Sequence, residues 1–424
     1  MLKLIIAIIY FVYVWVLARW PMFGLLISIF LIAGVHIEYL FFTELFWIGG
    51  VPISVYDMLV FPFLLFGLII VLKKPRRILG SLKYITTLSL FVIAIISACW
   101  GLYNYHELRI VLREFRNLLY FTLIVLITGH FVSDSKRLSL VENTIIFCGI
   151  TTSVWLIAYF LNSYYQYGLI SSAALRTKYL LATVPAMASG LLAYKEWDKP
   201  YMNLLVILLQ ELFLISIITS LARSAWGYYA AVFILMLIFN LHGKSKEFLK
   251  LILILGCSAS ILFVLVTYLT RTYYIDYIGM KKLIRMRAIS LLDKTAPENT
   301  FTVRVRGAKE LISSLPFYGW LVGMGLGGQR TEIVPVWYLW KLGIIGLLIW
   351  MITYTAGFFH PCFYLDKSSK IKTEASKWFV ATVPFLFIGS ITGTFMTTAG
   401  YILSGLYIGI NWKYIEINSK LENK

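Results

Sequence analysis

"YITTLSLFVIAIISACWGLY", residues Tyr84–Tyr103, holds twenty residues without one charged side chain. At about 1.5 Å per residue, a helix of this length crosses roughly 30 Å, the thickness of the hydrocarbon core of a bilayer. Similar runs recur along the 424-residue chain, which is 60% hydrophobic and only 14% charged, whereas soluble domains are roughly 25% charged. The sequence therefore predicts an all-α polytopic membrane protein in which residues 1–424 form a single transmembrane domain.

The apolar runs predict about 12–13 transmembrane helices. We place them at 4–17, 22–42, 56–72, 84–103, 108–131, 141–162, 178–194, 201–219, 225–241, 248–269, 336–356, 378–395 and 397–412. Thirteen spans put the amino terminus outside, whereas pairing or half-spanning of the first two runs leaves twelve with it inside, and both arrangements stay open. The first run follows Lys3 like a signal peptide, but Ala18–Pro21 lacks a small-x-small cleavage site, so we expect it to be retained.

The net charge of +18 is concentrated in short loops between these spans. Lysine and arginine resist translocation, so short loops rich in them stay in the cytoplasm. If the spans alternate as above, one side receives Lys73–Arg77, Lys136–Arg137, Lys195 with Lys199, Lys244 with Lys246, Lys367–Lys377 and the tail from Lys413. Without aromatic and basic RNA-binding signatures, this pattern indicates membrane lipid rather than nucleic acid as a partner.

The same alternation places residues 270–335 outside as one large loop with short helices of its own, and its ten basic and five acidic residues give a net charge of +5. Within it, "TFTVRVRGAKELISSLPFYG" (Thr300–Gly319) predicts a helix that is capped by Asn299 or Thr300 and stops before Pro316. The following "GWLVGMGLGG" (Gly319–Gly328) predicts a flexible turn that leads back to the membrane. It does not indicate a nucleotide site, because no strand precedes these glycines.

Several arginines are predicted on the same outer side. Arg109, Arg113 and Arg116 have the spacing i, i+4, i+7, which aligns them on one helix face, with His106 one turn earlier. They predict a phosphate site, and the alternative is snorkelling to lipid headgroups. Arg223, in "LARSAW" at an outer turn, is either a bidentate phosphate ligand or a helix cap.

Other candidate residues indicate structure rather than chemistry. Glu211 lies inside a predicted span, where an acid usually has a structural partner. The four cysteines, Cys99, Cys148, Cys257 and Cys362, have no metal-ligand spacing, so we predict neither a metal site nor a cofactor.

Three stretches, "LARSAW", "VRVRGAKELISSLPFYGWLVGMGLGG" and "YLWKLGIIGLL", resemble the O-antigen polymerase and O-antigen ligase superfamily, in detail only over Leu221–Trp350. The resemblance implies a metal-independent glycosyltransferase of the GT-C type in the bacterial inner membrane, with its active site facing the periplasm or exterior. The implied donor and acceptor are undecaprenyl-diphosphate-linked oligosaccharides, and a chain-length regulator is a further partner. Arg223 matches the family arginine after a span, and Arg304, or Arg306 as a substitute, matches the loop arginine.

The family resemblance includes two reactions. Ligases place a histidine where this chain has Glu332, which favours the polymerase branch over a ligase that transfers finished polymer to another acceptor. From different classes, a flippase or transporter would show matching halves with interrupted helices, which the sequence does not suggest, and a non-catalytic envelope scaffold stays open.

The chemistry of such a transfer is consistent with these residues. Negative charge builds on the departing diphosphate, and fixed cations lower the barrier. The predicted diphosphate ligands are Arg113, Arg116, Arg223, Arg304 and Arg306. A base helps the acceptor hydroxyl lose its proton. Glu332 is the first candidate, with Glu310 and His106 behind it; the alternative for Glu332 is an ion pair with Arg330 or another loop arginine.

Aromatic residues of the same region are candidates for sugar binding. They either stack on sugars or anchor the protein at the membrane interface. These residues are Trp320, Trp337 and Tyr338, together with Tyr273 and Tyr274.

Overall fold

The computed structural model describes most of the chain. The described ranges are 2–34, 46–48, 51–53, 55–73, 82–104, 106–132, 134–167, 179–194, 200–220, 222–240, 300–329, 331–364, 369–392 and 398–422. The expected span 248–269, residues 270–299 of the long loop and Arg330 lie outside these ranges.

Almost all of the described chain is helical, which confirms the helical class. The elements are α1 (Leu2–Arg19), α2 (Pro21–Ile29), the π-helix η1 (Phe30–Gly34), β1 (Phe46–Ile48), β2 (Val51–Ile53), α4 (Val55–Leu72), α6 (Leu82–Tyr103), α7 (Leu108–Phe131), α8 (Ser135–Tyr167), α10 (Tyr179–Ala193), α11 (Pro200–Thr219), α12 (Arg223–Asn240), α15 (Thr300–Ser313), α16 (Phe317–Val322), α17 (Val334–Phe359), the 3-10 helix η3 (His360–Tyr364), α18 (Ser369–Thr392) and α19 (Thr398–Glu422). The antiparallel hairpin β1–β2, in which Phe46 is opposite Ile53, was not expected.

Three described helices are long and apolar enough to cross a membrane: Tyr84–Tyr103 in α6, Ser135–Phe160 in α8 and Val334–Cys362, which includes α17. Several shorter apolar helices accompany them, among them Leu204–Thr219 and Ala375–Ile391. The large apolar side chains that remain exposed fit this setting. Val92 and Ile96 of α6 are examples. In a bilayer such side chains contact lipid tails and not water.

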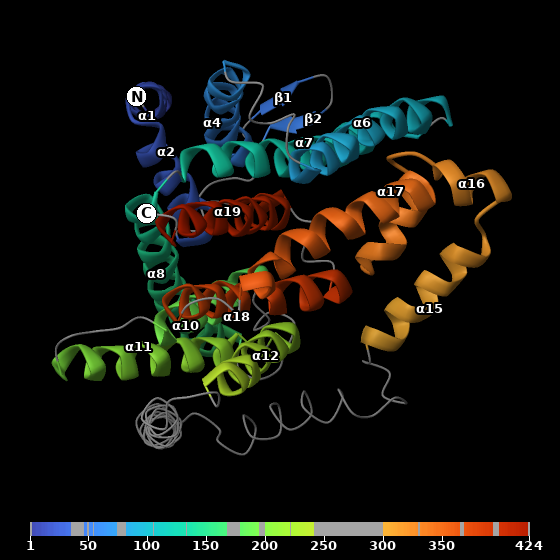
Figure 1. The fold of residues 1–424 in the computed structure, drawn as a ribbon. Coiled ribbons are helices and arrows are strands. Elements are labelled where there is room, and N and C mark those ends of the chain that lie inside the picture. Colours follow the sequence, from blue (N-terminus) through green and yellow to red (C-terminus); the bar gives the residue numbers. More distant parts are fainter. Residues whose placement is uncertain are drawn as a thin grey trace.

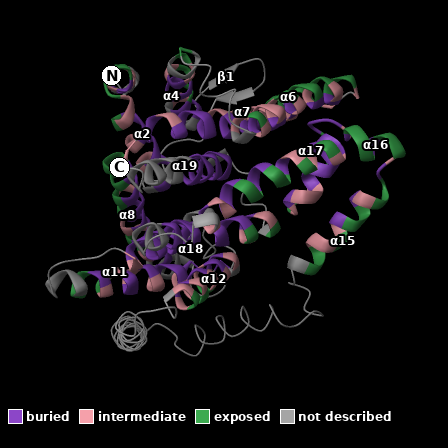
Figure 2. Cartoon of the chain, in the orientation of Figure 1, coloured by how far each residue is buried: buried purple, intermediate pink, exposed green. Residues whose placement is uncertain are grey.

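The centre of the fold is built around α7, which lies beside α19 (Figure 1). Two glycines of α19 permit this close approach: a Cβ on Gly405 would lie 2.9 Å from the Phe121 carbonyl oxygen, and one on Gly409 would lie 2.9 Å from Thr128 Cβ. Small residues at a helix interface let the backbones pack closely in membrane proteins. In Figure 2 the described part of α19 is almost entirely buried, whereas α6 and α16 carry many exposed residues.

An aromatic stack joins α7 to α17 within this core. The ring of Tyr354 lies 4.9 Å from that of Phe121 and 4.9 Å from that of Trp350, and Trp350 lies 4.8 Å from Tyr338. Such rings contribute about 0.5–1.5 kcal/mol per pair beyond their burial. The stack therefore fixes the face of α17 that meets α7.

A buried ion pair connects α8 to α18. Lys377 Nζ lies 2.8 Å from Glu142 Oε1, and the indole nitrogen of Trp378 donates to the same oxygen at 3.0 Å. Both charged side chains are about nine-tenths buried. The contact brings the amino-terminal part of α8, which carries Lys136 and Arg137, next to the amino-terminal part of α18.

Removing the carboxylate of this pair should destabilise the protein strongly. In Glu142→Ala the buried ammonium of Lys377 loses the carboxylate that balances its charge, so we expect a loss of about 3–5 kcal/mol in the free energy of unfolding. Arg137→Ala is the matched control, because its ion pair with Asp134 is exposed and such pairs contribute about 0–1 kcal/mol. Unfolding of both variants in detergent micelles measures the difference, and equal losses would contradict the assignment.

Candidate functional site

The basic helix α15 is seated on α17 by an apolar contact. Leu311 and Leu315 pack with Leu339 and Trp340 of α17, which leaves the arginine-bearing part of α15 free to face the segment before α17. The helix ends at Ser313, and Pro316 precedes α16. The predicted stop before Pro316 is confirmed.

Arg304 and Glu332 form an ion pair at the start of α17. Arg304 Nε donates to Glu332 Oε2. The arginine side chain is largely buried, whereas that of Glu332 is 58% exposed. Arg304, the arginine that the family resemblance singles out in the loop, therefore meets Glu332, the first candidate base. This is the ion pair with a loop arginine that the sequence offered as the alternative role of Glu332. Arg306, two residues further along α15, is exposed.

Helix α17 is broken at Gly343, whose φ of 69° and ψ of −173° are not helical. In a continuous helix, the carbonyls of Trp340 and Lys341 would accept from the amides four residues later. Here they accept instead from the amides of Met324 at 2.7 Å and Gly325 at 3.2 Å. We call residues Gly323–Gly328 the glycine strap, because this segment occupies the break in α17.

The glycine strap also binds α6 and the turn after it. The Leu326 amide donates to the Ser97 carbonyl at 3.0 Å, and Asn104 Nδ2 donates to the Met324 carbonyl at 3.2 Å. His106 Nδ1 donates to the Leu326 carbonyl at 2.8 Å. The prediction of a flexible turn over Gly319–Gly328 is wrong for the strap, because its backbone groups are fixed by three other segments.

Glycine is required in the strap by both conformation and space. Gly323, Gly325, Gly327 and Gly328 have φ between 56° and 95°, a region that side chains with a Cβ rarely adopt. A Cβ on Gly325 would lie 2.3 Å from the Gly101 amide nitrogen. The strap and α6 therefore meet backbone to backbone.

A buried acid and a buried lysine lie beneath the strap. Glu114 Oε2 of α7 accepts from the Gly327 amide at 2.8 Å and lies 3.3 Å from Lys341 Nζ of α17. Lys341 is fully buried. Neither residue was predicted as part of the site. Lys341 was nevertheless visible in the sequence as a lone charge in the apolar run "YLWKLGIIGLL", and such charges in membrane helices are usually paired.

Arg116 has a different partner from Arg304. Its Nη1 donates to Asp57 Oδ2 of α4 at 2.7 Å, and the Tyr120 hydroxyl donates to the other carboxylate oxygen at 2.5 Å. Sequence reasoning missed Asp57. Arg116 is therefore paired with a carboxylate of α4, whereas Arg304 is paired with Glu332 at the start of α17.

The remaining predicted ligands differ in how far the structure describes them. Arg113 is half-buried and Arg109 is exposed on α7. Arg223 is the first residue of α12, and its side chain lies outside the described part. Within that part, no group of three metal-ligating side chains is assembled.

The predicted sugar-stacking residues fall into two environments. Trp320 of α16 is 40% exposed, whereas Trp337 and Tyr338 are buried. The face of Tyr338 is covered by the stacked ring of Trp350. Of these three side chains, Trp320 alone presents its ring at the surface in this conformation. Tyr273 and Tyr274 lie outside the described residues.

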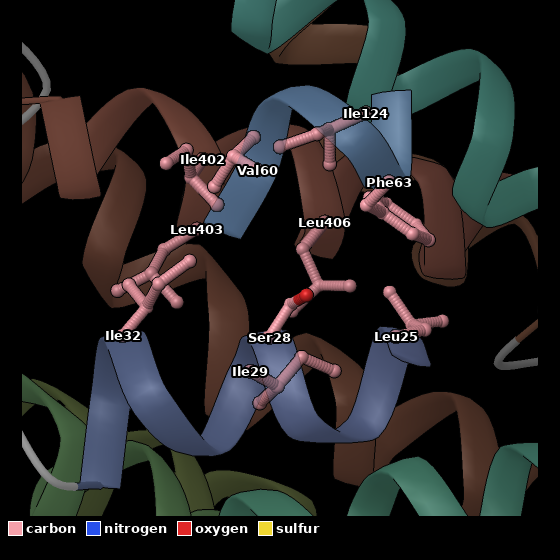
Figure 3. Close-up of a pocket in the computed structure, with 10 residues that line it drawn as sticks. All are labelled: Leu25, Ser28, Ile29, Ile32, Val60, Phe63, Ile124, Ile402, Leu403 and Leu406. Atoms are coloured by element: carbon pink, nitrogen blue, oxygen red, sulfur yellow. The ribbon is translucent and has the colours of Figure 1, made fainter. Parts of the chain in front are cut away.

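A small pocket of about 20 Å³ lies elsewhere, between α2, η1, α4, α7 and α19 (Figure 3). Its lining is apolar except for Ser28, which is hydrogen-bonded to the Tyr13 hydroxyl. This volume holds about one water molecule. At this volume and with this lining, the pocket offers no polar groups for a sugar beyond the Ser28 hydroxyl.

Comparisons with known proteins identify no family. No family model matches the sequence, and no curated protein matches it. The resemblance over Leu221–Trp350 thus stays a prediction that rests on the stretches quoted above.

The requirement for glycine in the strap can be tested by comparing alanine substitutions at one strap glycine and at one glycine of α15. Gly325→Ala should lower the free energy of unfolding by about 2 kcal/mol or more, because it combines a positive φ with a backbone clash. Gly307→Ala in α15 is the control: a Cβ there meets nothing within 4 Å, so the helix should gain about 0.5–1 kcal/mol. Unfolding in detergent measures both, and a Gly325→Ala variant as stable as the native protein would contradict the strap.

Proposed function

We propose that this protein is a membrane glycosyltransferase that polymerises undecaprenyl-diphosphate-linked oligosaccharide repeat units of a surface polysaccharide. In this proposal the chain has 12–13 spans in a GT-C-type arrangement and works on the outer side of the bacterial inner membrane, with residues 270–335 outside. The observation that carries it is the meeting of Arg304 with Glu332. A fixed cation and an accessible carboxylate then occupy one place at the start of α17.

The arrangement of charge along the fold supports this orientation. The pair of Glu142 and Lys377 lies near the chain segments that carry Lys136, Arg137 and the lysines before Lys377. The strap lies instead against the turn between α6 and α7. Helix α7, with 24 residues, separates that turn from the start of α8 by about 36 Å at 1.5 Å per residue.

The reaction forms one bond and breaks another. The acceptor hydroxyl oxygen attacks the anomeric carbon of the donor sugar, its proton passes to the Glu332 carboxylate, and the bond between that carbon and the diphosphate oxygen breaks. The departing lipid diphosphate takes the electron pair. Arg304 binds its oxygens bidentately, and Arg306, Arg113 and Arg223 add positive charge.

Substrate binding then changes the partner of Arg304. A diphosphate carries more charge than a carboxylate and offers oxygens that match the guanidinium fork. The diphosphate therefore competes with Glu332 for Arg304, and the released carboxylate becomes available as a base. Arg116 has a supporting role in this scheme, because its charge is balanced by Asp57. No metal ion or cofactor takes part in the proposed reaction.

The decisive assay incubates the purified protein with lipid-linked repeat units alone. A polymerase converts them into a ladder of products, whereas a ligase, a flippase or a scaffold produces none. Arg304→Ala should slow ladder formation by about 10²–10³-fold, because one fixed charge at the leaving group is lost. Arg304→Lys should restore only part of the rate, because an ammonium does not reproduce the bidentate contact. Lys309→Ala, at an exposed position of the same helix, is the control.

The role of Glu332 is tested by removing its ability to take a proton. Glu332→Gln should slow the reaction by about 10²–10⁴-fold, because an amide cannot accept the proton of the acceptor hydroxyl. A variant that keeps the wild-type rate would show that Glu332 is not the base. Wild-type ladders from Arg304→Ala, in protein that inserts normally, would refute the proposed function.

A further inference from the structure

The short helix α16 is exposed in an unusual way. Every residue of α16 except Gly319 is a large apolar or aromatic residue with a substantial exposed surface; these residues are Phe317, Tyr318, Trp320, Leu321 and Val322. Phe317 reaches 84%. A run of exposed apolar residues of this kind marks an interaction surface.

This surface continues onto a helix that is apolar enough to cross a membrane. A Cβ on Gly343 of α17 would lie 2.1 Å from the Leu321 carbonyl oxygen, so α16 contacts α17 at the break. Beyond the break, Ile345, Leu348 and Ile352 form an exposed apolar stripe on α17, with the spacing i, i+3, i+7 of one helix face. The exposed residues of α16 therefore adjoin the stripe that faces lipid if α17 spans.

The residue types on and beside α16 match the edge of a bilayer. Phe317, Tyr318 and Trp320 are of the aromatic class that is enriched where the hydrocarbon meets the headgroups. Arg306 and Lys309 of the preceding helix are exposed, and cations in this position attract anionic headgroups. A soluble partner or a second copy would explain the apolar surface, but not its continuity with the stripe on α17.

We propose that α16 is an interfacial membrane anchor, whose side chains from Phe317 to Val322 insert at the boundary between headgroups and acyl chains. The occupant of this surface is the bilayer itself, with anionic lipids next to α15. The segment Thr300–Val322 thus lies along the membrane surface, with α16 inserted and the exposed cations of α15 on the aqueous side. The inference stands on exposure and continuity alone and holds whether or not the protein is a glycosyltransferase.

The anchor can be tested with a fluorescent probe in a full-length protein. Cys99, Cys148, Cys257 and Cys362 are replaced by alanine, and one new cysteine is labelled with an environment-sensitive dye. The test positions are Phe317→Cys and Leu321→Cys, with Leu348→Cys as the lipid control and Lys309→Cys as the aqueous control. Each protein is reconstituted into vesicles of phosphatidylethanolamine and phosphatidylglycerol.

We expect brominated acyl chains to quench the probes at 317 and 321, as at 348. Iodide in the buffer should quench them at least about threefold less than the probe at 309, because an interfacial helix is buried about 5–10 Å into the headgroup boundary. Quenching by iodide equal to that at 309 would place α16 in water and overturn the proposal. Protection from both quenchers would also overturn it, because protein would then cover the helix. Two test positions keep the result interpretable if one variant does not fold.

Discussion

The break in α17 at Gly343 is the constraint on which the local structure depends. Backbone groups inside an apolar protein must be hydrogen-bonded, and an interrupted helix is stable only where another segment satisfies the groups that it releases. The glycine strap does this for the carbonyls of Trp340 and Lys341. Because the strap also binds α6 and the turn that follows it, the break determines where three helices meet. The positions of α16, α15 and Arg304 follow from it, since all three lie just before the strap in the chain.

Three buried or largely buried ion pairs connect helices that are distant in the sequence. Glu114 pairs with Lys341, Asp57 with Arg116 and Glu142 with Lys377. Replacing such a pair by apolar residues is often neutral, whereas removing one partner is costly. Each pair therefore contributes less to stability than to specificity, because a shift of one helix by a turn would leave two charges unpaired. The pairs fix the register of α7 against both α4 and α17.

The sequence predicted features set by local chemistry and missed those set by packing. The span at 108–131 coincides with α7, and Pro316 marked the end of α15, because hydrophobic runs and prolines act on their own segment. The strap was mistaken for a flexible turn, because the sequence does not show which distant carbonyls its amides will bind. Arg116 was grouped with the other arginines by helical spacing, which is correct for α7. Its partner Asp57 lies on α4, and residue spacing within one helix does not show which other helix will pack against it.

The orientation of the strap amides has a consequence for anion recognition. Glycine-rich loops often hold phosphates by pointing several amides at one oxygen cluster. Here the amides of the five consecutive residues 323–327 all donate inward, to carbonyls or to the Glu114 carboxylate. The loop has no main-chain donor left for a ligand along this stretch. Any phosphate bound beside it depends on side-chain cations, which makes its recognition sensitive to single substitutions in a way that a main-chain cradle is not.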